Sequence, residues 1–181
     1  MLLPGHVGAS YLVAAACARI FRRQGAQPRT VTTALALFAL GAGLVSDVDI
    51  VPMLLRVGWD PLGRVASEHR ASLLHTPLFA VAAGIVVLAL PLRDRWLWAT
   101  VGCAAVIVHL LLDSLSIGPG VMWLHPWSDA FYGLNLANTR YGTDWGDQWL
   151  WRYITHPLFL IEVAILAAAA VVLRRQRTFT R

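Results

Sequence analysis

Residues 96–116, WLWATVGCAAVIVHLLLDSLS, form an apolar stretch in which Asp113 carries the only formal charge at neutral pH. At about 1.5 Å per residue, a helix of this length crosses the roughly 30 Å hydrocarbon core of a bilayer. Lipid offers no water to the backbone, so such a stretch has to satisfy its own amide groups within a helix. The stretch therefore predicts a transmembrane helix.

Four further apolar runs of similar length accompany it, at residues 6–22, 30–50, 72–91 and 153–173. The chain is 57% hydrophobic and 14% charged, with a mean hydropathy of +0.60, which lies outside the usual range for a soluble domain. We therefore expect an all-α fold, a polytopic membrane helix bundle with about five transmembrane helices. It should form a single domain over 1–181, with an outer loop at 118–152.

The distribution of basic residues predicts the orientation of the bundle. All 15 basic residues are arginines, and ten of them lie in 19–29, 93–95 and 174–181. Basic residues that flank membrane helices favour the cytoplasmic side. We expect the C-terminus in the cytoplasm, and the N-terminus and both long loops outside. The net charge of +5 is thus a topology signal, so we predict membrane lipid and no nucleic acid as a partner.

His109 and Asp113 form an ionisable pair within the quoted stretch. A spacing of four residues places an imidazole and a carboxylate on one helix face, as two ligands of one metal ion require. A hydrogen bond between the two side chains that stabilises the helix is the alternative for this pair taken alone.

Other ionisable residues lie at the same predicted outer end of the helices: His6, Asp47, Asp49, His69, Arg70 and His75. Solvated helix ends and exposed loop positions are the alternatives for each of them taken singly. Ionisable groups at membrane depth are costly unless they are paired or bind a metal, so a convergent set favours a metal site. We predict one or two ions at this end, with ligands from the following pool: His6, Asp47, Asp49, His75, His109 and Asp113.

Ligands that mix imidazole and carboxylate without thiolate suit Zn²⁺, with Mn²⁺ as the second choice. Cys17 and Cys103 each lie inside an apolar run, where we interpret them as small core residues. His69 is the predicted acid or base. Arg70 is the predicted clamp for an anionic oxygen, because its planar guanidinium can donate two hydrogen bonds at once.

Three blocks of this sequence resemble the YdjM-like family of LexA-regulated inner-membrane proteins: Gly43–Asp49 (GLVSDVD), His69-Arg70 with His75, and His109–Ser116 (HLLLDSLS) with Gly120–Pro126 (GVMWLHP). The resemblance covers about 1–128. It implies a bacterial inner-membrane location and metal-dependent hydrolase activity. The sequence departs from the family pattern at Ser46, where proline is usual, and by one extra residue between His69 and His75.

These observations predict a membrane-bound metal-dependent hydrolase that acts on an ester or phosphoester, with a lipid as the natural substrate at the outer face. The alternative is a non-catalytic membrane protein with a structural metal site or a transporter-like ion pathway. A pathway would need polar residues that continue to the cytoplasmic helix ends, where the sequence has few. Polar residues with a purely structural role at the lipid interface are the third alternative.

Overall fold

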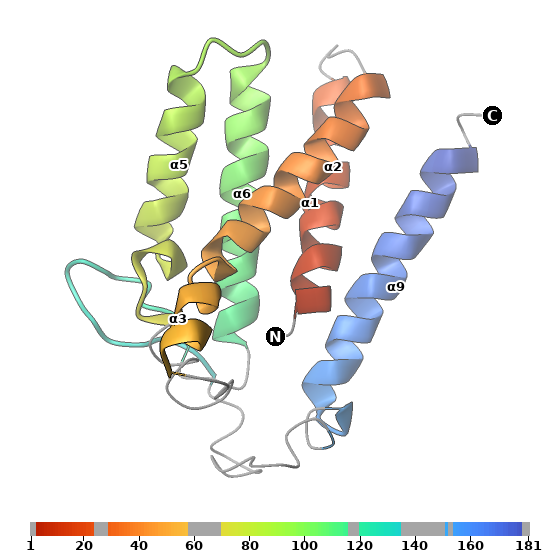
Figure 1. Ribbon diagram of the computed structural model, residues 1–181. Helices are drawn as coiled ribbons and strands as arrows, with labels where there is room; N and C mark the ends of the chain where they lie inside the picture. The colour runs from red at the N-terminus through yellow and green to blue at the C-terminus, as the bar shows by residue number, and fades with distance from the viewer. Residues whose placement is uncertain are drawn as a thin grey trace.

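The computed structural model describes residues 3–23, 29–57, 70–115, 120–134, 151 and 154–178. Within these ranges the chain is helical and contains no strand. Five long helices carry the fold: α1 (Leu3–Arg23), α2 (Arg29–Leu44), α5 (Pro77–Ala89), α6 (Arg95–Ser114) and α9 (Pro157–Thr178). Long helices that follow one another in the chain run in alternating directions, so the N-terminus and the C-terminus lie toward opposite ends of the bundle (Figure 1).

Helices α1 and α6 hold the bundle together. Helix α1 contacts α2, α6 and α9, and α6 contacts α1, α2 and α5. The flanking helices α5 and α9 therefore lie on opposite sides of the bundle (Figure 1). Mostly small side chains fill the shared core, which consists of Ala14, Ala18, Leu35, Ala39, Leu97, Val101 and Ala105. Small residues let helix backbones approach closely, which is the usual basis of helix association in lipid.

Large apolar side chains face outward on the flanking helices. Val81, Ile85 and Val86 of α5 and Leu160 of α9 are each more than half exposed. Three stretches within the described residues are long and apolar enough to cross a membrane: Ala34–Pro52, Arg95–Ser114 and Pro157–Arg175. Helix α5 is apolar but shorter. The expected all-helical membrane architecture is confirmed, whereas the count of about five spans stays a prediction.

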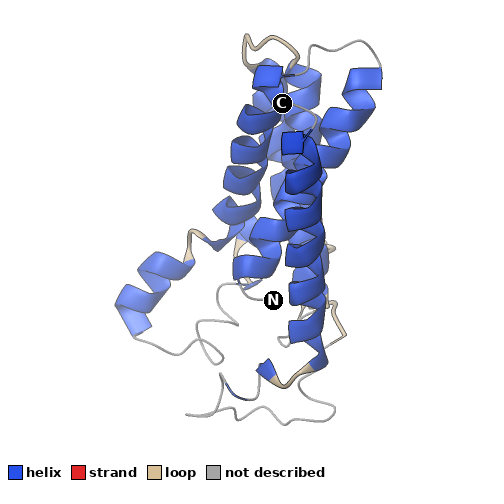
Figure 2. Ribbon diagram, turned by 90° about the vertical axis from the view of Figure 1, so that its right-hand side faces the viewer, coloured by secondary structure: helices blue, strands red, loops and turns tan. Residues whose placement is uncertain are grey.

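The run expected as one helix over 30–50 is broken near its end. Helix α2 stops at Leu44, a 3₁₀ turn η1 (Val45–Asp47) follows, and a short helix α3 (Ile50–Val57) begins after it. Helix α3 points away from the bundle (Figures 1 and 2). Because of this break, Asp47 and Asp49 do not have the positions that a continuous α-helix would give them.

The run expected over 72–91 also starts differently. A 3₁₀ turn η2 (Leu73–His75) precedes α5, which begins only at Pro77. Proline fits the first turn of a helix but disfavours helical geometry in the residue before it. Thr76 is accordingly extended, with φ −124° and ψ 151°, and its hydroxyl accepts a hydrogen bond from the Phe79 amide at 3.4 Å. The proline therefore separates His75 from α5.

Residues 120–134, within the loop expected at 118–152, form a folded segment. The backbones of Val121 and Tyr132 exchange two hydrogen bonds of 3.0 and 2.9 Å. The segment is tied to the end of α6, because Leu134 donates its amide to the Ser114 carbonyl at 2.8 Å. Gly120 has φ +99°, and a Cβ there would overlap the carbonyl of Tyr132. Glycine is therefore required at position 120 by both conformation and space.

We predict that Gly120→Ala lowers the free energy of unfolding by about 1–3 kcal/mol, the usual cost of one strained backbone position. Circular dichroism during heating of the protein in detergent measures the effect as a lower melting temperature. Gly41→Ala is the matched control, because a Cβ at that position meets nothing within 4 Å. Equal melting temperatures of the two variants would contradict the arrangement of this segment.

Candidate metal centre

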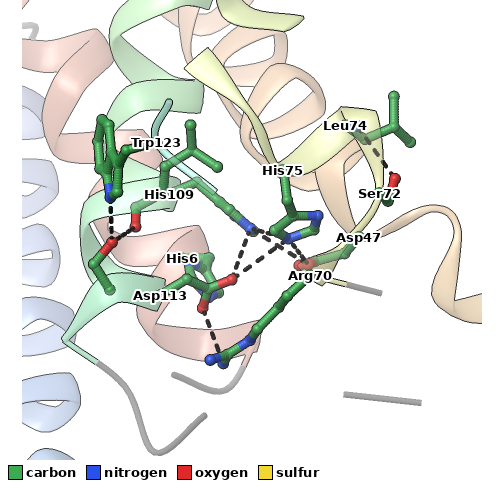
Figure 3. A network of polar contacts seen from close by, with 11 residues as sticks. His6, Asp47, Arg70, Ser72, Leu74, His75, His109, Asp113 and Trp123 are labelled. Carbon is green, nitrogen blue, oxygen red and sulfur yellow. Dashed lines mark hydrogen bonds and ion pairs between the residues drawn. The ribbon is translucent and has the colours of Figure 1, made fainter. Parts of the chain in front are cut away.

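Four polar side chains from three parts of the chain meet at one end of the bundle (Figure 3). Asp47 ends η1, His75 ends η2, and His109 and Asp113 lie one helical turn apart on α6. His75, His109 and Asp113 are at most 3% exposed, and Asp47 is half-buried. The site is therefore assembled from three helix ends and is largely removed from solvent.

Local structure explains why each side chain faces the same point. On α6 the four-residue spacing puts His109 and Asp113 on one face, as the sequence predicts. The two 3₁₀ turns η1 and η2 contact each other, which brings Asp47 beside His75. Turn η2 is fixed by its own caps: Ser72 accepts the Leu74 amide at 3.2 Å, and the Thr76 hydroxyl donates to the Leu73 carbonyl at 2.8 Å.

Five contacts of similar length join the donor atoms of these four side chains. His109 Nε2 is 3.2 Å from His75 Nε2, 3.4 Å from Asp47 Oδ1 and 3.5 Å from Asp113 Oδ2. His75 Nε2 is 3.6 Å from Asp47 Oδ1 and 3.4 Å from Asp113 Oδ2. Two ligands of a tetrahedral Zn²⁺, bound at about 2.0–2.2 Å, are about 3.3–3.6 Å apart. These five contacts therefore have the lengths expected between ligands of one metal ion.

Hydrogen bonds among the same four atoms explain the geometry less well. The two carboxylate oxygens carry no proton when ionised, and each imidazole Nε2 has room for one. At most two protons would then have to serve the five contacts, and the 3.2 Å contact between two protonated Nε2 atoms would be repulsive. A cation can accept one lone pair from each of these donor atoms, so the residues present fit a divalent metal.

His6 and Arg70 face the other carboxylate oxygen of Asp113. Oδ1 of Asp113 is 3.4 Å from His6 Nε2 and 3.7 Å from Arg70 Nη2. The ring of His6 also stacks on His109, with centroids 4.0 Å apart and an angle of 24° between the planes. His6 is 3% exposed and Arg70 9%. His6, His109 and Asp113 thus form a second group of close donors beside Asp47, His75 and His109.

The structure brings together most of the residues that the sequence predicts for the site. Asp49 follows Asp47 by two positions but is not in either group of close donors among the described residues. His69 lies outside the described residues. His125 pairs instead with Asp129 at 3.1 Å, and His156 accepts the Leu158 amide at 3.2 Å at the start of α9. The last two histidines are therefore separate from the donor groups.

Two glycines that sequence reasoning missed set the helix spacing at the site. A Cβ on Gly43 would overlap the Ser10 hydroxyl of α1, so this glycine lets α1 and α2 approach one turn before Asp47. A Cβ on Gly5 would lie 3.0 Å from Cγ of Glu162, a buried residue of α9. Small residues at helix contacts are the sequence signal that could have identified both positions.

We predict that the purified wild-type protein retains Zn²⁺ through dialysis and that His109→Ala loses most of it, because His109 contacts the three other donors. Elemental analysis of the protein in detergent gives the metal content per chain. His125→Ala should keep the wild-type content, because His125 lies outside both groups. Full metal content in a folded His109→Ala protein would refute the assignment.

A family model described as YdjM inner membrane protein matches residues 1–178. No curated protein and no solved structure matches the chain. The match confirms the resemblance noted over 1–128 and extends it to nearly the full sequence. The donor groups on η1, η2 and α6 fall within the matched region, and the chain belongs to the YdjM inner membrane protein family.

Proposed function

We propose that this protein is a membrane-bound metal-dependent hydrolase that cleaves an ester or phosphoester bond at the outer face of the inner membrane. The observation that supports this most is the buried cluster of imidazole and carboxylate donors 3.2–3.6 Å apart, from Asp47, His75, His109 and Asp113. Zn²⁺, or Mn²⁺ as the second choice, would act there as a Lewis acid that activates water and polarises the substrate.

The remaining polar groups of the site have roles that follow from their chemistry. Arg70 Nη2 lies 3.7 Å from Asp113, beside the donor set, where a guanidinium can bind an anionic oxygen of the substrate. His69 directly precedes Arg70 in the sequence and is our candidate for the acid or base. Asp49 is the next candidate for the base.

We propose a lipid or lipid-linked substrate because of what surrounds the site. Near this end of the bundle, Leu124 and Trp127 of the segment 120–134 are 50% and 85% exposed, and Val51 and Leu55 of α3 are 58% and 85% exposed. Apolar and tryptophan side chains at a helix end favour the layer of lipid headgroups. An ester in that layer could reach the donor set from the side without leaving the membrane.

A one-sided site fits hydrolysis better than transport. Beyond the donor set, the described core between α1, α2 and α6 consists of apolar residues such as Leu35 and Val101. An ion pathway would need polar groups along that core. A structural metal site is the second candidate, since an ion bound by all four side chains would have a closed coordination shell, whereas an ion bound by three of them, such as Asp47, His75 and His109, keeps a position open for water.

We predict that the protein in mixed micelles hydrolyses a phospholipid or a generic phosphoester, that chelation abolishes the rate, and that Zn²⁺ or Mn²⁺ restores it. A colorimetric or chromatographic assay over a panel of lipids and phosphoesters measures the product. His69→Ala should keep the metal and lose roughly 10²-fold or more in rate, the usual contribution of a positioned acid or base. His125→Ala should retain the wild-type rate. A metal-loaded protein without activity across the panel would favour the structural site.

We predict that the end of the bundle with the donor set faces outward. In a protein without its native cysteines, Ala130→Cys should react with an impermeant maleimide on intact cells, because the arginine distribution places the loop outside. Leu92→Cys, in the turn between α5 and α6, should react only after lysis. Both positions are exposed in the structure. The reverse pattern of labelling would invert the orientation and move the site to the cytoplasmic side.

A further inference from the structure

The two groups of close donors raise the question of how many ions the centre holds. One group contains Asp47, His75 and His109, and the other contains His6, His109 and Asp113. In two-metal hydrolases the ions are about 3.5–4 Å apart, and a carboxylate can bridge them. Asp113 has the right position for a bridge, because Oδ2 faces His75 and His109 while Oδ1 faces His6 and Arg70.

Through its Nε2, His109 can serve only one of the two groups at a time. Its Nε2 is the atom that contacts Asp47, His75 and Asp113, and one imidazole nitrogen has one lone pair for one ion. An ion bound by Asp47 and His75 therefore takes His109, the residue common to both groups, as its third ligand. Among the described residues, a second ion would then have His6 Nε2 and Asp113 Oδ1, 3.4 Å apart, as two of its ligands.

Arg70 stands at the place where that second ion would bind Asp113. Its Nη2 lies 3.7 Å from the same Oδ1 that faces His6. A guanidinium stays protonated in proteins and has no lone pair to offer a metal. The side chain is 9% exposed, so little solvent screens its charge from Oδ1. A divalent ion at this position would meet a fixed positive charge in place of a ligand.

We propose that the centre holds a single ion and that Arg70 supplies the second positive charge of the site across the Asp113 carboxylate. This rests on the metal site of the proposed function and narrows its substrate class. A metal ion and a guanidinium side by side can each bind an oxygen of a phosphoryl group, as two ions do in two-metal sites. The substrate is therefore a phosphoester. A neutral carboxylic ester has no anionic oxygen for the Arg70 guanidinium to bind.

The number of ions is the first test, measured by elemental analysis of the wild-type protein and two variants saturated with Zn²⁺ and then dialysed. The wild type and Arg70→Met should each hold one ion per chain, because the methionine removes the charge and its soft thioether is a poor ligand for Zn²⁺. Arg70→Glu should hold up to two, because a carboxylate replaces the cation beside His6 and Asp113. Two ions in the wild type would overturn the proposal while leaving the metal site intact. No ion in the wild type would overturn the proposed function as well.

The second test uses Co²⁺ as a spectroscopic substitute and inorganic phosphate as the probe. Phosphate should perturb the visible absorption of the Co²⁺-loaded wild type, and its dissociation constant should rise about tenfold or more in Arg70→Met, the usual effect of losing a charge-assisted hydrogen bond. Arg70→Lys should recover part of that loss, because a point charge lacks the planar fork. Neutral acetamide, which carries no charge for Arg70 to bind, should bind equally to the wild type and Arg70→Met. Phosphate affinities within twofold of each other in the wild type and a Co²⁺-loaded Arg70→Met protein would overturn the role of Arg70.

Discussion

The close contact between two imidazole nitrogens and two carboxylate oxygens is the constraint on which this end of the molecule depends. His109 Nε2 and His75 Nε2 lie 3.2 Å apart, and both are within 3.6 Å of carboxylate oxygens of Asp47 and Asp113. Lone pairs repel at such distances unless protons or a cation lie between them. Buried polar groups of this kind destabilise a membrane protein unless they have partners. The cluster is therefore more stable with a bound cation than with its donor atoms facing one another alone.

Interrupted helices are what make that contact possible. A continuous helix through 30–50 would turn Asp47 and Asp49 to different faces, since residues two apart diverge by about 200°. The 3₁₀ turn η1 and the start of α3 break this repeat, and only Asp47 joins the donor set among the described residues. Pro77 has the matching effect before α5, because it keeps Thr76 extended and leaves His75 on a separate turn that contacts η1.

Close helix packing then brings α1 to the site. The absence of a Cβ at Gly43 lets Ser10 of α1 pack against α2, and the absence of a Cβ at Gly5 leaves space for the buried side chain of Glu162 from α9. With α1 held between these neighbours, His6 reaches Asp113 and stacks on His109. The segment 120–134 packs on the same end of α6, where Trp123 donates its indole N–H to the Ser114 hydroxyl at 2.8 Å. Small residues between the helices thus allow the close packing that holds the polar cluster together, while apolar side chains cover the outside of the bundle.

Local periodicity was enough to predict part of this arrangement. The apolar runs indicate helices, and the four-residue spacing of His109 and Asp113 places both on one face because the helix repeat is fixed. Convergence at one end follows from the alternating direction of successive helices. The helix breaks near Asp47 and His75 were harder to predict, since an apolar run does not show where a regular helix gives way to a 3₁₀ turn. Other contacts join residues far apart in the chain. His75 contacts His109, His6 stacks on His109, and Asp113 directs one oxygen to the donor set and the other to Arg70. Such contacts depend on how whole helices pack, and side-chain spacing along the sequence carries no information about them.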